Sequence, residues 1–183
     1  TAYFGTYNTT LDSYTKQIFD TNFIKGSIKN ADTKSKYNTR FQYHKKTENR
    51  AISSSEITKE IDTIIGNKRY LELIITPNRK INKYEFITKN KLNLQQFKVN
   101  DVLVNDGKTY NVKSGTFLVY HLGNKDKEVA LSFAIDKATN LDLILNEISY
   151  DLLRNANFSI NSRTEEMMPM PFVTNDAIII TKK

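Results

Sequence analysis

The chain lacks cysteine and tryptophan, and its 183 residues include only two histidines, three prolines and six glycines. The absence of cysteine excludes thiol catalysis, disulfide bridges and cysteine-based zinc sites. No Walker-type or dinucleotide-binding glycine motif is present, and there is no Gly-x-Ser-x-Gly nucleophile elbow. No apolar stretch approaches the roughly 18 residues of a transmembrane helix. The sequence begins at Thr1 without a signal peptide, so we expect an excised or processed piece.

The bulk composition is that of a soluble folded domain, with 39% hydrophobic and 26% charged residues. The net charge is +7, but the basic residues are spread along the chain and never form a run longer than two. No cluster of arginine and aromatic residues concentrates this charge. We therefore expect a solvated basic surface and no nucleic-acid partner.

The first third of the chain has a mixed pattern. Apolar residues at helical spacing predict a short helix over residues 10–20, with Thr9 or Thr10 as its cap. Alternating aromatic residues predict a strand over residues 36–44. The serine tract at residues 53–55 has the composition of a connection.

From residue 56 onward, alternation predicts short strands separated by turns. The expected features are a hairpin around Gly66–Lys68, strands at Tyr84 and Phe97, a hairpin at Asn105–Gly107, a strand over Phe117–His121 followed by a Gly123–Asn124 turn, a strand over Glu128–Asp136 and a last strand over Ala177–Thr181. Residues 141–153 fit a strand or a helix equally.

This spacing of strands predicts a mainly β fold, an antiparallel β-sandwich of Ig-like or jelly-roll-like type with a short N-terminal helix. We expect residues 1–183 to form a single β-sandwich domain. Residues 1–55 are expected to be a helix-and-loop N-terminal extension packed on it.

The candidate catalytic groups are few. His44 and His121 have no carboxylate at metal-ligand spacing, which favours surface or structural histidines. Acidic pairs such as Glu165 with Glu166, or Asp136 with Glu147, have the composition of a general acid and base. Exposed polar residues in loops are the simpler interpretation. We therefore predict no catalytic, cofactor-binding or metal-binding residue in this chain.

The closing segment, residues 158–182, has an unusual composition. Pro169 and Pro171 prevent an ordinary helix or central strand. The segment must either dock on its own domain or be offered to a partner. We predict docking, with Met167, Met168 and Phe172 mostly buried. The ten tyrosines and ten phenylalanines could form a sugar-stacking platform, but most fall at inward-pointing positions and predict core packing.

Several segments together carry a resemblance to a known family. The most distinctive of their residues are Tyr70, Pro77, Asn78, Arg163, Met167, Met168, Pro169, Pro171, Phe172 and Asp176. With Gly5–Tyr7, Leu11–Thr15, Ser35–Asn38 and Asn157–Ser159, they resemble the C-terminal extracytoplasmic region of membrane-embedded zinc exopeptidases. The family is metallopeptidase family twenty-eight, of aminopeptidase Y type, in its Bacteroidetes-like versions. That family usually has tryptophan at the position of Tyr14.

The resemblance implies a non-catalytic accessory domain of a membrane-anchored zinc metallopeptidase, with a role in interaction, stability or substrate access. It implies the extracytoplasmic (periplasmic) side of a bacterial membrane, and zinc only in the parent's peptidase domain. The implied partners are that peptidase domain or another envelope protein, with membrane contact only through helices upstream of Thr1. The alternative is a free-standing exported binding module for a glycan or a protein.

Overall fold

The computed structural model describes residues 1–28, 35–123 and 127–183 and divides into two compact units. Unit 1 comprises Thr1–Ile52 and Ser149–Ile178, and unit 2 comprises Ser53–Ile148 and Ile179–Lys183. The N-terminal segment thus shares a unit with the chain that follows residue 148, and each unit is described by itself. The expected Gly123–Asn124 turn includes Asn124, which lies outside the described residues.

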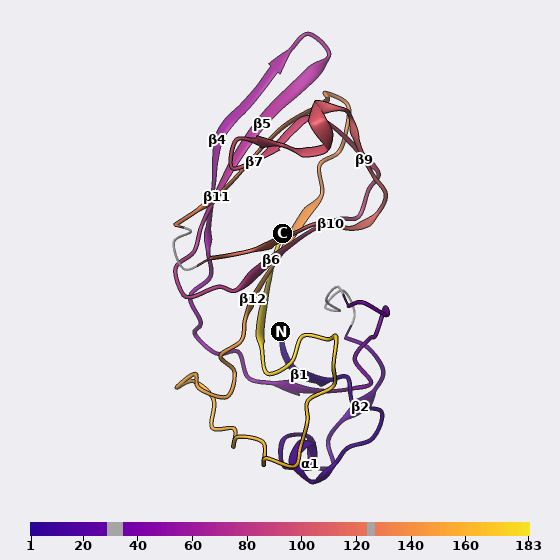
Figure 1. Cartoon of the computed structure of the whole chain (residues 1–183), viewed down its shortest axis with the longest axis vertical. Helices are drawn as coiled ribbons and strands as arrows, with labels where there is room; N and C mark the ends of the chain where they lie inside the picture. The colour runs from indigo at the N-terminus through magenta and orange to yellow at the C-terminus, as the bar shows by residue number, and fades with distance from the viewer. Residues whose placement is uncertain (29–34, 124–126) are drawn as a thin grey trace. The chain divides into compact units, whose positions relative to one another are not determined.

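Unit 2 contains two antiparallel sheets (Figure 1). The larger has the order β4 (Glu56–Ile65), β5 (Lys68–Thr76), β11 (Val129–Asp136), β7 (Leu92–Val99) and β8 (Val102–Leu103), and β9 (Tyr110–Val112) also pairs with β7. The smaller has the order β10 (Gly115–His121), β6 (Lys83–Thr88), β12 (Leu143–Ser149) and β13 (Ile178–Lys182).

Alternating side chains of the two sheets form one hydrophobic core. In β11 the alternation is nearly complete, because Val129, Leu131, Phe133 and Ile135 are all buried. Phe97 of β7 packs edge-on against Phe133, with 6.2 Å between the ring centroids. From the smaller sheet, Tyr84, Phe86 and Leu145 join the same cluster. The predicted mainly β, antiparallel sandwich is therefore confirmed.

The turns of unit 2 agree with the sequence more closely than its strand pairing does. Asn105, Asp106 and Gly107 all have positive φ angles (58°, 51° and 75°), as a tight left-handed turn requires. The strands on either side, β8 and β9, both pair with β7, so the hairpin predicted here was wrong. Residues 143–149 are a strand, because β12 pairs with β6.

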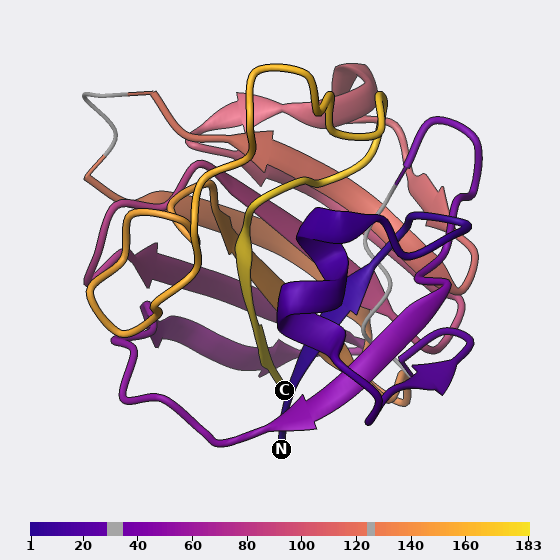
Figure 2. The same ribbon diagram turned by 90° about the horizontal axis from the view of Figure 1, so that it is seen from below.

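Unit 1 contains the third sheet, with the order β1 (Ala2–Thr6), β3 (Tyr43–Thr47) and β2 (Ile24–Lys25). The helix α1 (Ser13–Phe19) lies against β1 (Figure 2). Its cap is Asp12, whose carboxylate accepts from the Thr15 amide, so the prediction of Thr9 or Thr10 was wrong. The strand predicted over 36–44 was also misplaced, because Tyr37 lies in a turn.

Aromatic packing holds the small sheet of unit 1. The ring of Tyr7 stacks on that of Phe41 at 4.3 Å, and both residues are buried. Gly5 is required beneath this stack, since a Cβ there would lie 2.9 Å from the Phe41 ring. Phe4 meets Phe158 edge-on, which ties β1 to the second segment of the unit.

Candidate functional site

The residues that carry the family resemblance fall into two groups. Tyr70, Pro77 and Asn78 belong to unit 2, and the other seven belong to the Ser149–Ile178 segment of unit 1. Asn78 donates from its side chain to the Ser54 carbonyl at 3.0 Å, so this position holds the chain that enters β4. Tyr70 is on β5, opposite Ala134 of β11. Asn78 therefore has a structural contact, and Tyr70 is an exposed residue of a paired strand.

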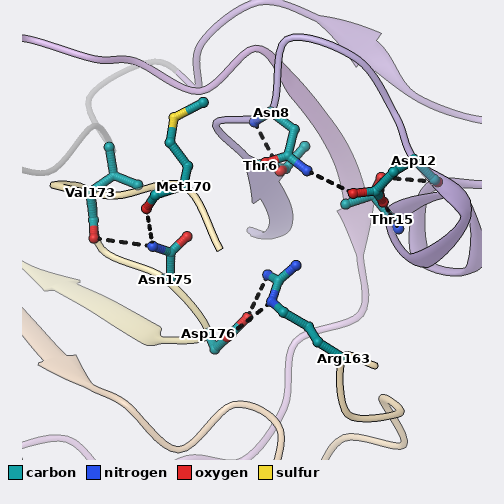
Figure 3. A network of polar contacts seen from close by, with 9 residues as sticks. All are labelled: Thr6, Asn8, Asp12, Thr15, Arg163, Met170, Val173, Asn175 and Asp176. Atoms are coloured by element: carbon teal, nitrogen blue, oxygen red, sulfur yellow. Dashed lines mark hydrogen bonds and ion pairs between the residues drawn. The ribbon is translucent and has the colours of Figure 1, made fainter. Parts of the chain in front are cut away.

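Arg163 and Asp176 of the second group bind each other (Figure 3). The Arg163 Nη2 donates to Asp176 Oδ1 at 2.8 Å, and its Nε donates to Asp176 Oδ2 at 3.3 Å. This two-point pairing is partly buried, and its planar geometry is one that lysine does not reproduce. Burial alone would lower the pKa of Arg163, but the hydrogen bonds that it donates to Asp176 and the charge of that carboxylate outweigh it, and the pKa is raised.

The Arg163 guanidinium also lies over the ring of Tyr14, 4.6 Å from its centroid. Tyr14 is in α1, so Arg163 joins the helix to the closing segment of unit 1. The Tyr14 hydroxyl is buried and has no hydrogen-bond partner among the described residues. Burial raises the pKa of Tyr14. Arginine, aspartate and tyrosine therefore form a structural anchor.

Asp12 extends this anchor into the helix cap. Its Oδ1 accepts from both the amide and the hydroxyl of Thr15, each at 2.7 Å, and Asn8 donates to its Oδ2. Burial alone would raise the pKa of Asp12, but the hydrogen bonds from Thr15 and the charge of Arg163 lower it overall. The ionised carboxylate is thus part of the folded state of unit 1.

Residues 167–172, which lie between Arg163 and Asp176, are more exposed than the sequence predicted. Met168 is 87% exposed and Phe172 is 59% exposed, and only Met167 is half-buried. Pro169 and Pro171 are exposed as well. The prediction of a buried tail was wrong here, and the buried rings of unit 1 are others, such as Tyr7, Phe41 and Phe19.

Phe172 is part of a small exposed cluster. Its ring meets the ring of Tyr37 edge-on at 5.5 Å, and Tyr37 is 65% exposed. The Lys36 ammonium lies 4.9 Å from the centroid of Phe172 and 5.4 Å from that of Tyr37. We call Lys36, Tyr37 and Phe172 the aromatic surface. It combines two apolar rings with one cation at the surface of unit 1.

Both loops that present the aromatic surface are fixed by hydrogen bonds. The Asn175 side chain donates to the Met170 carbonyl at 2.6 Å and to the Val173 carbonyl at 3.4 Å (Figure 3). The Thr39 amide donates to the Ser35 hydroxyl at 2.6 Å, which closes the turn around Tyr37. Phe172 itself has a φ angle of 63°, which is unfavourable for a bulky residue.

A buried polar cluster in unit 2 was not predicted from the sequence. Glu147 is fully buried on β12, and both its carboxylate oxygens accept from the Ser55 amide at 3.0 Å. The Ser55 and Tyr84 hydroxyls are 2.6 Å apart, and the Lys182 ammonium donates to the Ser55 carbonyl. The Glu147 carboxylate therefore caps the chain entering β4 and is inaccessible to a substrate.

The remaining acidic candidates do not form an acid–base pair. Asp136 is exposed and pairs with Lys68, so its surroundings differ from those of the buried Glu147. Glu165 and Glu166 lie exposed in a loop, as expected. The interpretation of Glu147 as an exposed loop residue was wrong.

The histidines and carboxylates do not gather into a metal centre in the described part of the chain. His121 is exposed, and the Nδ1 of His44 is 2.9 Å from the Gly26 carbonyl. Residues 1–28, 35–123 and 127–183 contain no group of three or more histidine, aspartate or glutamate side chains placed to hold a metal ion. Within the same ranges no helix has the length and apolar character needed to cross a membrane.

One hollow opens on unit 1, with a volume of about 520 Å³. Lys16, Lys25 and the aromatic ring of Tyr43 line part of it. Asp20, also in its wall, pairs with Lys45. The hollow is open to solvent and brings together no reactive pair of groups, so the aromatic surface is the better candidate site.

Comparisons with protein-family models, with curated proteins and with solved structures found no significant match to this chain. The fold and the side-chain geometry of the described residues are the structural features that remain. They define an all-antiparallel β protein with an exposed, cation-bearing pair of aromatic rings.

Sequence reasoning named Phe172 but missed its contact with Lys36 and Tyr37. The two segments are far apart in the chain, and neither has a periodic pattern that points to the other. The sequence itself assigned Lys36 and Tyr37 to a strand, so the proline before Phe172 is the main unusual feature that it offers at this surface.

Proposed function

We propose that this chain is a non-catalytic interaction domain that binds an extended protein segment at the aromatic surface of Lys36, Tyr37 and Phe172. We further propose that it serves as the accessory domain of a membrane-anchored zinc metallopeptidase. The first proposal is supported by the geometry of the surface. The second rests on the sequence resemblance.

The observation that carries the binding proposal is the exposure of a conformationally strained aromatic residue. A bulky residue at positive φ destabilises the folded chain by on the order of 1 kcal/mol. Burial of the ring would offset this cost, but an exposed ring gains little free energy from burial. Phe172 combines both features. Because the two loops are fixed by Asn175 and Ser35, a partner would meet a preorganised surface and lose little entropy in ordering it.

The arrangement of the rings favours a peptide over a sugar. Sugar stacking needs an open flat face, but the Tyr37 and Phe172 planes meet at 86°. Lys36 already lies over Phe172. An ammonium beside two apolar ring edges suits a segment with an apolar anchor and a nearby carboxylate. We propose that the partner is such a segment of the parent's own peptidase domain or of another envelope protein.

The cellular setting is part of the same proposal. On the family resemblance, the domain acts on the extracytoplasmic, periplasmic side of a bacterial membrane. Zinc would be held by the parent's peptidase domain, and this chain would control substrate access or stabilise the assembly.

A peptide-display selection on the purified chain tests the binding surface. We expect the selected peptides to combine an aromatic or large aliphatic residue with an acidic one. Binding should fall at least about tenfold in Tyr37→Ala and Phe172→Ala, since buried aromatic anchors dominate interface energies. Tyr150→Ala, another exposed tyrosine of unit 1, is the matched control and should bind normally.

Two results would contradict this function. Binding that survives both aromatic substitutions would remove the aromatic surface from the proposal, and strong signals on a glycan array would favour the glycan-binding alternative. In a separate assay, the chain is incubated with zinc and aminopeptidase substrates. Turnover above that of a heat-denatured sample would overturn the non-catalytic assignment.

A further inference from the structure

A second exposed surface, on unit 2, is independent of the aromatic surface. The strand β4 is ten residues long, and every one of its residues is exposed. Among the described residues it pairs with β5 only, so its other edge forms the end of the sheet. Figure 1 shows the β4–β5 hairpin extending past the neighbouring strands of that sheet. Long, apolar edges of this kind are templates for further strand pairing.

The side chains of β4 are apolar beyond what an edge strand needs. Ile64 is 59% exposed and Ile65 is 64% exposed, and Ile57 and Ile61 are exposed too. Natural proteins usually protect such edges with charged side chains, proline or short length, and β4 has charged residues at Glu56, Lys59, Glu60 and Asp62. The charges present here, such as Lys59 and Asp62, are placed to pair rather than to repel.

A bulge decides which side chains share a face. Lys59 is opposite Leu73 and Ile61 is opposite Glu72, so Glu60 is the extra residue. Residues directly opposite in an antiparallel pair lie on the same face of the sheet. Ile57, Lys59, Asp62 and Ile64 therefore share one face, and Thr58, Thr63 and Ile65 share the other. The Lys59–Asp62 approach of 3.7 Å agrees with this arrangement.

Most of the sequence of β4 between Ile57 and Ile64 is complementary to itself when read in the opposite direction. Residues 57–64 are Ile-Thr-Lys-Glu-Ile-Asp-Thr-Ile. An antiparallel partner of the same sequence, centred between Glu60 and Ile61, would set isoleucine against isoleucine, threonine against threonine and lysine against aspartate. The central pair, Glu60 against Ile61 at the bulge, does not match. In a regular strand, residues an odd number of positions apart, such as Ile57 and Ile64, point to opposite faces of the sheet, so they could not pair across this axis. The bulge at Glu60 removes that conflict.

We propose that two copies of this chain associate through the free edges of β4, which joins their larger sheets across a two-fold axis. Lys59 of each copy faces Asp62 of the other, and Ile57 faces Ile64 of the other. In a two-fold interface every pair occurs twice, so each substitution acts twice. The partner is a second copy because three of the four kinds of pair across residues 57–64 match: Ile57 with Ile64, Thr58 with Thr63, and Lys59 with Asp62.

Sedimentation and light scattering over a range of concentrations test this dimer, with a charge swap as the deciding variant. Lys59→Asp sets aspartate against Asp62 in both halves of the interface. It should raise the dimer dissociation constant at least about tenfold. It leaves the bonds between Asp62 and Arg69 within each copy in place, so the fold should persist.

Lys91→Asp, at an exposed position of the same unit, is the matched control and should leave association unchanged. Circular dichroism confirms that each variant is folded. A chain that stays monomeric near 1 mM, far above the concentrations at which specific interfaces of standard size form, overturns the proposal. A dimer insensitive to Lys59→Asp also overturns it.

Discussion

Arg163 and Asp176 form a two-point ion pair across thirteen residues of the closing segment of unit 1. Because the same guanidinium lies over Tyr14 of α1, one side chain fixes the segment to the helix. The intervening residues, including Phe172, are then held as an exposed loop. The pair therefore determines how the candidate binding surface is presented.

Arg163→Met should destabilise the chain by about 2 kcal/mol, because it leaves the partly buried Asp176 carboxylate without its bidentate donor. Arg163→Lys should recover less than half of this loss, since a single ammonium cannot make both bonds. Urea unfolding measures both values. Combining Arg163→Met with Asp176→Asn should cost less than the sum of the single variants, and simple additivity would show that the two residues do not interact.

Asp12 should make the chain sensitive to acid. The folded pKa of Asp12 is below its ordinary value, so its contribution to stability is full above about pH 4 and is lost as pH falls through the folded pKa. Asp12→Asn keeps a good helix cap and should cost only about 0.5–1 kcal/mol at pH 7. Its unfolding free energy should fall less steeply between about pH 4 and pH 2 than that of the original chain.

Thermal melts across that pH range provide the measurement. Asp106→Asn, in the exposed left-handed turn that asparagine also tolerates, is the control and should keep the original acid dependence. An Asp12→Asn curve parallel to the original would contradict the assignment.

Glu147→Ala should be among the most damaging single substitutions, with a loss of about 3 kcal/mol or more. It leaves the buried Ser55 amide without its acceptor and creates a cavity. Glu147→Gln retains one acceptor oxygen and should cost about 1–2 kcal/mol. Glu128→Gln, an exposed glutamate of the same unit, should be neutral in the same urea titration. A near-neutral Glu147→Ala would show that the carboxylate does not cap the chain at Ser55.

Loss of the hydroxyl group should change the stability of the chain differently at two buried tyrosines. Tyr84→Phe removes the hydrogen bond with Ser55 and should cost about 1 kcal/mol. Tyr14→Phe removes a buried hydroxyl that has no partner among the described residues, so stability should be unchanged or higher. Equal losses in both variants would contradict this distinction.

Tyr84 and Tyr14 also predict how the stability of the chain changes at alkaline pH. Burial raises the pKa of Tyr84 and of Tyr14 above the ordinary value of 10.0. Unfolded tyrosine ionises near pH 10 while the folded groups stay protonated, so stability should fall as pH rises above about 10. In each phenylalanine variant this fall should be shallower, as unfolding monitored by circular dichroism at pH 9 to 11 would show.

The strands of unit 2 were largely predictable because their signals are local. The alternation in β11, the Gly66–Asn67 turn and the left-handed turn at Asn105–Gly107 each depend on a few consecutive residues. Burial at every second position leaves a pattern that a sequence displays directly. Strand partners are not local, which is why the hairpin predicted at Asn105–Gly107 was wrong: β8 and β9 both pair with β7.

The candidate site was much less predictable. Phe172 was expected to be buried because apolar rings usually are, but burial depends on whether the core has room for the ring. The charge of Glu147 suggested an exposed loop. Burial of its carboxylate is less costly because the Ser55 amide donates a hydrogen bond to it. Neither outcome follows from neighbours in the sequence.

By itself, the sequence determined the mainly β class, the short helix and most of the turns, because these depend on the spacing of side chains over a few residues. It also determined the absence of cysteine chemistry and of the common nucleotide-binding motifs. Only the tertiary structure decided that Arg163 binds Asp176 over Tyr14, and that Phe172 meets Tyr37 and Lys36 at the surface. It alone placed β4 at a free edge, because strand order and side-chain exposure arise from contacts between distant segments.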